Sequence, residues 1–207
     1  MRSQELELTN SALDMALRFT GQRLGNVQLV NWEGGWLEIA AQRGFHQDFL
    51  EVFQRVSIRD GCACGRALFL RQTVVIDDVS ADHDFRPFVE VAKRAGFSAV
   101  QSTPLITPGG AVLGIISTHG GYNPSSPQLE QIRSLAQQTA NELIRLRARV
   151  DAVLPSGRKL IQNARNLLDD KKPDTFLGAR QCISKPNDVP SPAGEMEAPA
   201  TAPSFRG

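Results

Sequence analysis

The sequence predicts an α+β fold: an antiparallel sheet of about five strands, with the first and last helices on one face and short insert helices on the other. Two pairs of strand-like segments, each joined by a Gly-Gly turn, predict hairpins. Long segments with apolar residues at helical spacing precede the first hairpin and follow the second. Between the hairpins lie short helical pieces and one β-branched strand, so we expect a sheet that is covered on both faces.

The first element is an amphipathic helix over residues 8–20, where apolar residues recur every three or four positions. Two strands follow over residues 26–32 and 36–42, with the turn Gly34-Gly35 between them. This part of the sequence therefore predicts a helix followed by a hairpin.

Residues 45–72 have helical spacing only in short pieces, the second of which covers residues 63–70. A β-branched strand follows over residues 73–79. Pro87 stands near the start of the next helix, where its missing N–H is not needed. We expect these short helices to form the insert that covers one face of the sheet.

The second hairpin, over residues 97–118, carries the most informative pattern in the chain. Small polar residues interrupt its apolar strands. They are Gln101, Ser102, Thr103, Ser117, Thr118 and His119. Alternation along a strand sends Ser102 to one face of the sheet, and Gln101 and Thr103 to the other. Polar side chains on such strands favour a small-molecule pocket on one face, and hydrogen bonding at the strand ends is the alternative.

A long helix is predicted over residues 127–153 because its apolar residues form a heptad seam. The seam comprises Leu129, Ile132, Ala136, Thr139, Leu143, Leu146, Val150 and Val153. We expect the first half to pack on the sheet and the second half to form a homodimer; a plain surface helix is the alternative. Residues 148–170 are predicted to be a helical extension that ends in a short amphipathic piece. Residues 171–207 hold six of the chain's 12 prolines, and this composition predicts a disordered tail.

Composition narrows the class of protein. The chain has 207 residues, a hydrophobic content of 41% and a net charge of +1, so no basic surplus favours nucleic acid or an anionic membrane. No apolar stretch is long enough for a transmembrane helix, and the polar, acidic N-terminus is unlike a signal peptide. Three cysteines, an odd number, are typical of a reducing compartment. We therefore expect a cytoplasmic protein that binds neither nucleic acid nor membrane.

Several segments, taken together, resemble a known family. They are WLEIAAQRGF (36–45) followed by FLEVF (49–53), DGCACGRAL (60–68), VVIDDVSADHDF (74–85), AGFSAVQSTPLITPGGAVLGIISTH (95–119) and PQLEQIRSLAQQTANELIRLR (127–147). In this order the chain resembles a GAF domain of the kind found in bacterial two-component and other sensory proteins. The resemblance implies that residues 1–147 form a PAS-like sandwich that holds a ligand between the sheet and the insert helices. It also implies outer helices that dimerise and pass a signal to a downstream signalling protein.

The resemblance does not name the ligand, and the cofactor remains unknown. The asparagine- and lysine-containing motif of cyclic-nucleotide binders is absent, as is the C-x-x-C-H motif of covalent haem. Neither Cys62 nor Cys64 is followed by the histidine that is usual at a bilin attachment site. In the sensory subgroup that the chain resembles, Cys62 stands where serine is common and Cys64 where cysteine is usual.

Cys62 and Cys64 flank one residue at a predicted helix start, where the helix dipole lowers the pKa of a thiol and favours reactivity. The pair can contact a ligand, oxidise or bind a metal, although two thiols do not complete a zinc site. Burial as small apolar side chains is the other explanation. His119 either meets a ligand or is structural. The candidate pocket comprises Cys62, Cys64, Gln101, Ser102, Thr103 and His119.

Two further groups of charged residues have alternative explanations. An acidic patch suits a divalent cation, but it lacks the spacing of a calcium loop, and the capping of turns and helices explains it more simply. The patch comprises Asp77, Asp78, Asp82, Asp84 and the neighbouring His83. Arg43 and Arg66 either bind an anionic ligand or are surface charges.

No nucleophile elbow, phosphate-binding loop or dinucleotide fingerprint is present. The first hypothesis is therefore a non-catalytic sensory module that binds an unidentified small molecule or senses redox state at Cys62 and Cys64. The second is a redox enzyme of the free methionine sulfoxide reductase type. The third is a dimerisation platform without a ligand.

Overall fold

A computed structural model describes residues 2–153 of the chain, and the side chains of residues 3–149. Within this range the order of elements follows the sequence prediction: helix, hairpin, insert, hairpin and long helix. Most of the predicted extension over residues 148–170 and the whole predicted tail over residues 171–207 lie outside the described residues.

The described residues form one six-stranded sheet in the order β3-β2-β1-β6-β5-β4, and every pair of neighbours is antiparallel. The strands are β1 (Leu24–Asn31), β2 (Trp36–Arg43), β3 (Arg55–Val56), β4 (Val74–Ile76), β5 (Ala99–Ile106) and β6 (Val112–Gly120). The predicted number of about five strands is one too low, because β3 has only two residues and no pattern of alternation marks it. β4 is also shorter than the predicted strand over residues 73–79.

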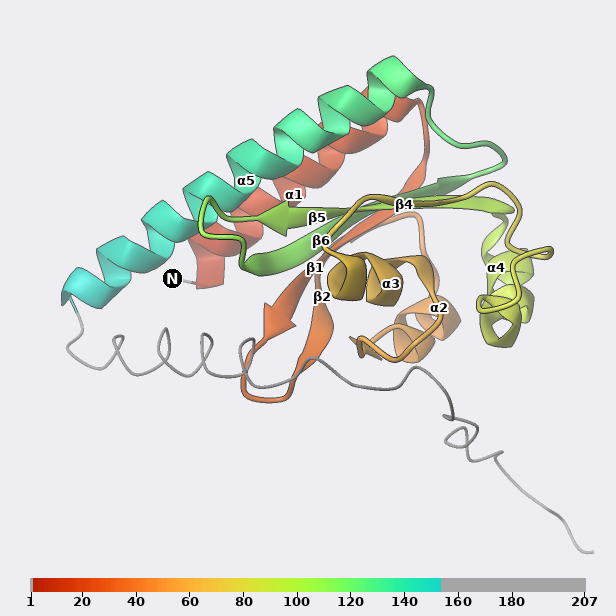
Figure 1. Ribbon diagram of the computed structural model, residues 1–207, viewed down its shortest axis with the longest axis horizontal. Coiled ribbons are helices and arrows are strands. Elements are labelled where there is room, and N and C mark those ends of the chain that lie inside the picture. Colours follow the sequence, from red (N-terminus) through yellow and green to blue (C-terminus); the bar gives the residue numbers. More distant parts are fainter. Residues whose placement is uncertain (1, 154–207) are drawn as a thin grey trace, which may run out of the picture. The chain divides into compact units, whose positions relative to one another are not determined.

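Helices cover both faces of this sheet, as Figure 1 shows. α1 (Arg2–Thr20) and α5 (Ser126–Val153) lie side by side on one face. The insert elements on the other face are α2 (Gln47–Val52), α3 (Ala63–Leu70), the 3₁₀ turn η1 (Arg86–Phe88) and α4 (Val89–Ala95). The predicted layers are thus confirmed, with α1 starting six residues earlier than the apolar pattern indicated.

Each face of the sheet has its own apolar core. The core against α1 and α5 includes Leu13, Ala16, Val27, Leu105, Ile116 and Leu143. The core under the insert is rich in aromatic rings and includes Phe45, Phe49, Phe53, Phe85 and Phe97. We call the two sides of the sheet the outer-helix face and the insert face.

The first half of the predicted seam on α5 is buried within the same chain. Ile132, Ala136 and Leu143 are at most 1% exposed, and Ala136 and Leu143 belong to the core that α5 shares with α1 and the sheet. Farther along, Arg147 donates to Glu5 of α1 over 2.8 Å. Packing of the first half on the sheet is confirmed, whereas pairing of the second half with another chain stays a prediction. None of the described helices has both the length and the apolar character that crossing a membrane requires.

Candidate functional site

The three central strands place a row of polar side chains on the insert face. Asn26 of β1 is opposite Ser117 of β6, which is in turn opposite Ser102 of β5. Their faces follow from alternation, since Val100 and Ile115 lie in the insert-face core. All three polar residues are buried, and the hydroxyls of Ser102 and Ser117 are 2.7 Å apart. The middle of the insert face is therefore polar, although it is closed to solvent.

Gln28 and His119 extend this polar row in the two directions along the strands. Gln28 is fully buried, and its Nε2 donates to the carbonyl oxygen of Phe53 over a long 3.4 Å. His119 packs against aromatic rings of the insert-face core. Its ring centroid lies 5.0 Å from that of Phe45, 5.8 Å from Phe49 and 4.7 Å from Phe97. The imidazole thus has an apolar surrounding on the insert side.

Three buried polar atoms on this face lack a hydrogen-bond partner. They are Oδ1 of Asn26, Oε1 of Gln28 and Nδ1 of His119. A buried polar group without a partner costs about 1–3 kcal/mol, and native proteins pair nearly all such groups. Three of them lie on one face of one sheet, which makes the insert face the candidate site.

The site carries no charge. No aspartate, glutamate, lysine or arginine is buried among the residues whose side chains the structure describes. Burial lowers the pKa of His119 from 6.5 to about 3, because the surrounding apolar groups disfavour the imidazolium ion. At neutral pH the whole candidate site is therefore uncharged.

Cys62 and Cys64 lie in the same insert-face core, at the start of α3. Both are buried, and their sulfur atoms are 3.5 Å apart. The pKa of Cys64 is raised well above the ordinary thiol value, first by the hydrogen bond with Cys62 and then by burial. The expectation of a lowered pKa is wrong for Cys64, because these two effects outweigh the helix dipole. Among the described residues no group of three metal-ligating side chains comes together.

The structure divides the predicted pocket between the two faces of the sheet. Cys62, Cys64, Ser102 and His119 all belong to the insert face. Gln101 and Thr103 lie on the outer-helix face, where the hydroxyl of Thr103 donates to Oε1 of Gln101 over 2.9 Å. Thr103 also borders a surface groove of about 370 Å³ beside α5, away from the polar row. The six residues therefore do not form one pocket.

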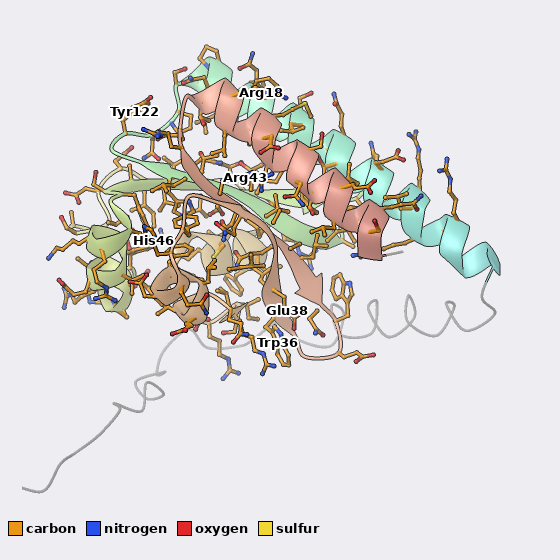
Figure 2. The ribbon with its side chains drawn as sticks, turned by 180° about the vertical axis from the view of Figure 1, so that it is seen from behind. Arg18, Trp36, Glu38, Arg43, His46 and Tyr122 are labelled. Carbon is orange, nitrogen blue, oxygen red and sulfur yellow. The ribbon has the colours of Figure 1, made fainter. Side chains whose placement is uncertain are left out.

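The acidic patch and the two arginines make internal contacts. Oδ1 of Asp82 accepts hydrogen bonds from the backbone N–H groups of Asp84 and Phe85, and Oδ2 accepts from Arg66 over 2.8 Å. These contacts favour the capping explanation of the patch. Arg43 of β2 (Figure 2) donates to Asp14 of α1 and so ties the first helix to the sheet.

Two residues of the site were not among the predicted candidates. Asn26 and Gln28 alternate with apolar residues in β1, a pattern that a strand with one solvent-facing side also shows. What could have identified them is the position of β1 in the fold. A strand between two others, with helices on both sides, has no solvent-facing side, so polar residues there need a partner.

The match to known proteins agrees with this architecture. A family model described as the GAF domain matches residues 3–143. A domain of a protein described as a two-component sensor histidine kinase from Sinorhizobium meliloti has a TM-score of 0.60 at 17% identity, covering 72% of this chain and 96% of that chain. The GAF domain/HD domain protein from Geobacter sulfurreducens has a TM-score of 0.56 at 17% identity, and the match covers 67% of this chain and 91% of that chain.

A third similar structure is an enzyme. Free methionine-R-sulfoxide reductase from Neisseria meningitidis, solved in complex with its substrate, has a TM-score of 0.52 at 17% identity, covering 66% of this chain and 78% of that chain. At these identities the likeness shows the fold alone. A comparison with curated protein sequences found no match.

Proposed function

Because this chain belongs to the GAF domain family, we propose that it is a non-catalytic sensory module that binds a small molecule between the sheet and the insert helices. The observation that carries the proposal is the set of three unpartnered atoms on Asn26, Gln28 and His119. A ligand that pairs with them offsets a cost that the unliganded protein bears.

Binding has to move the insert. Aromatic rings occupy the space above the polar row, with Phe45 and Phe49 stacked at a centroid distance of 3.6 Å. A ligand that reaches the row displaces some of these rings, and α2, which carries the buried Phe49, shifts with them. The ligand thereby favours a second conformation. The free energy by which it shifts the equilibrium between the two conformations equals the difference in its binding free energy for them.

The output is proposed to run through α5 to a partner protein. α5 packs on the same sheet as the candidate site, from the opposite side, and α1 packs against it. A change in the sheet thus reaches α5 directly. If two chains pair through residues 127–153, a movement of α5 changes the geometry of the dimer, and a downstream signalling protein recognises that change.

The non-catalytic part of the proposal rests on the two thiols. An enzyme of the free methionine sulfoxide reductase type needs a nucleophilic thiolate and a resolving cysteine. The raised pKa of Cys64 disfavours the thiolate, and burial of both sulfur atoms limits access. The close Cys62–Cys64 contact keeps this activity as the second candidate function, and an assay with free methionine-R-sulfoxide decides between them.

Native mass spectrometry of the full chain, purified from its own host without refolding, tests the proposal. We expect a dimer that carries one small molecule per chain, and less of that molecule on an Asn26→Leu/Gln28→Met variant. An empty dimer whose stability does not respond to small molecules contradicts the proposal and favours the ligand-free platform.

A further inference from the structure

The charged residues of α2, α3 and α4 all make hydrogen bonds or ion pairs outside the buried core. Asp48 of α2 pairs with Arg94 of α4 at 3.0 Å, and Glu51 of α2 accepts from Gln47. Arg66, the single charged residue of α3, pairs with Asp82, and Glu90 pairs with Lys93 within α4 at 2.8 Å. None of these charged residues is buried, and Arg86 of η1 is exposed, so the insert helices direct no charge toward the sheet.

The sheet side is equally free of charge. The polar groups of the insert face are two amides, two hydroxyls and one neutral imidazole, and all of them are buried. Moving an ion from water into such a site costs several kcal/mol unless an opposite charge meets it. Since no buried counter-ion exists among the described residues, a charged ligand group is disfavoured here.

The unpartnered atoms also define what the ligand presents. Nε2 of Gln28 is committed to the carbonyl oxygen of Phe53, which leaves Oε1 as an acceptor without a donor. Asn26 lies two residues away on the same face of β1, and its amide makes no hydrogen bond, so either its oxygen or its NH₂ group can face a ligand. The Gln28 oxygen therefore calls for an N–H or O–H donor, and Asn26 beside it offers a second polar contact.

We propose that the ligand is an uncharged ring compound that presents a hydrogen-bond donor to Gln28 and a second polar group to Asn26, and that these two residues determine its specificity. The ring character follows from the phenylalanine side chains above the row, which stack favourably on flat molecules. The inference rests on the proposed function, since it names the ligand class of the same site.

Matched pairs of compounds that share a ring and differ in charge test this inference. Suitable probes, in which both members keep the same ring donors, are uracil and orotate, adenosine and adenosine monophosphate, and guanosine and guanosine monophosphate. Thermal unfolding of the full chain is measured with each at millimolar concentration. A ligand at about 100 times its Kd stabilises a protein by about 2.7 kcal/mol, so we expect an uncharged member to raise Tm and its anionic partner to bind at least about tenfold more weakly, a difference of about 1.4 kcal/mol.

The outcomes separate the inference from the proposed function. If an anionic member binds as tightly as its uncharged partner, the ligand class is wrong while the sensory function stands. If no member of the three pairs changes Tm, the ligand class is contradicted, and the proposed function then depends on the compound recovered from the host. A recovered compound that is charged overturns the inference alone.

Two variants show whether the named residues recognise the ligand. Gln28→Met keeps the volume of the side chain but removes the acceptor, so we expect it to abolish the response to the uncharged probe. Gln101→Met is the matched control, because Gln101 is equally buried but lies on the outer-helix face. An equal loss of response in both variants contradicts a specific role for Gln28.

Discussion

Two buried glutamines provide a direct test of whether the insert face is built for a ligand. Gln28 and Gln101 are both 0% exposed, and their strands flank β6 on either side. Gln101 has partners at both ends: Nε2 donates to Thr118 over 3.4 Å, and Oε1 accepts from Thr103 over 2.9 Å. Gln28 has one partner at 3.4 Å and an unpartnered Oε1. Methionine has nearly the volume of glutamine, so it isolates the polar contribution.

The two substitutions are expected to change the free energy of unfolding by different amounts. Gln28→Met loses one long hydrogen bond and leaves the carbonyl oxygen of Phe53 without that donor, but it also removes a buried unpartnered acceptor that costs about 1–3 kcal/mol. We expect these terms to offset one another, so the stability of the unliganded protein should change by less than about 1 kcal/mol. Gln101→Met loses two hydrogen bonds and leaves Thr118 without its donor, so a loss of about 1–3 kcal/mol is expected.

Urea unfolding of the full chain, followed by circular dichroism, measures both changes. In a chain of this size 1 kcal/mol corresponds to about 2–4 °C in Tm, so thermal unfolding provides an independent check. If Gln28→Met destabilises the protein as much as Gln101→Met does, the Gln28 amide is a structural group, and the main support for a ligand on the insert face is lost.

Three other predictions concern the histidine, the thiols and the helix seam. His119 is neutral when buried, and its pKa has the ordinary value of 6.5 in the unfolded chain, so the contribution of His119 to folding stability should be constant above that pH and fall by about 1.4 kcal/mol per pH unit below it. His119→Phe should flatten this pH profile, measured by urea unfolding between pH 4 and 8. An unchanged slope would exclude His119 as the cause of the pH dependence. Iodoacetamide should modify Cys64 far more slowly in the folded protein than in urea, as followed by peptide mass spectrometry. The protein should also not reduce free methionine-R-sulfoxide. Turnover that is abolished by Cys64→Ser would instead show that the protein is an enzyme. Val150→Glu, in the predicted seam, should shift sedimentation equilibrium toward monomer, whereas Arg149→Glu, outside the seam, should leave it unchanged; equal behaviour of both variants would place the dimer contact elsewhere.

Most of the fold was predictable because its elements carry local signals. The Gly-Gly turns fix both hairpins, and the helix over residues 63–70 was predicted with the bounds that the structure gives. β3 was missed because two residues show no periodicity, and its pairing with Leu37 and Glu38 is a tertiary contact. The early start of α1 was missed for a related reason. Its first turn is polar, and the contact between Glu5 and Arg147 that engages it spans most of the domain.

The site was predictable only in part, because alternation separates the two faces of a strand without saying which face binds a ligand. The polar run in β5 therefore contains both Ser102, which lies on the insert face, and Gln101, whose partners lie on the other side of the sheet. Asn26 and Gln28 gave no signal of their own. Their burial depends on the insert, which is contributed by residues far away in the sequence.

The energetics of the insert face distinguish a ligand-binding module from a ligand-free platform. A fully packed aromatic core is what a platform needs, and the phenylalanine rings provide it. Three unpartnered groups at about 1–3 kcal/mol each are a large part of the 5–15 kcal/mol by which domains are stable. In a platform, apolar residues at positions 26, 28 and 119 would remove that cost with no loss of function. Their polar identity is explained if the packed arrangement is one of two states, and if the other state pairs these groups with a bound molecule.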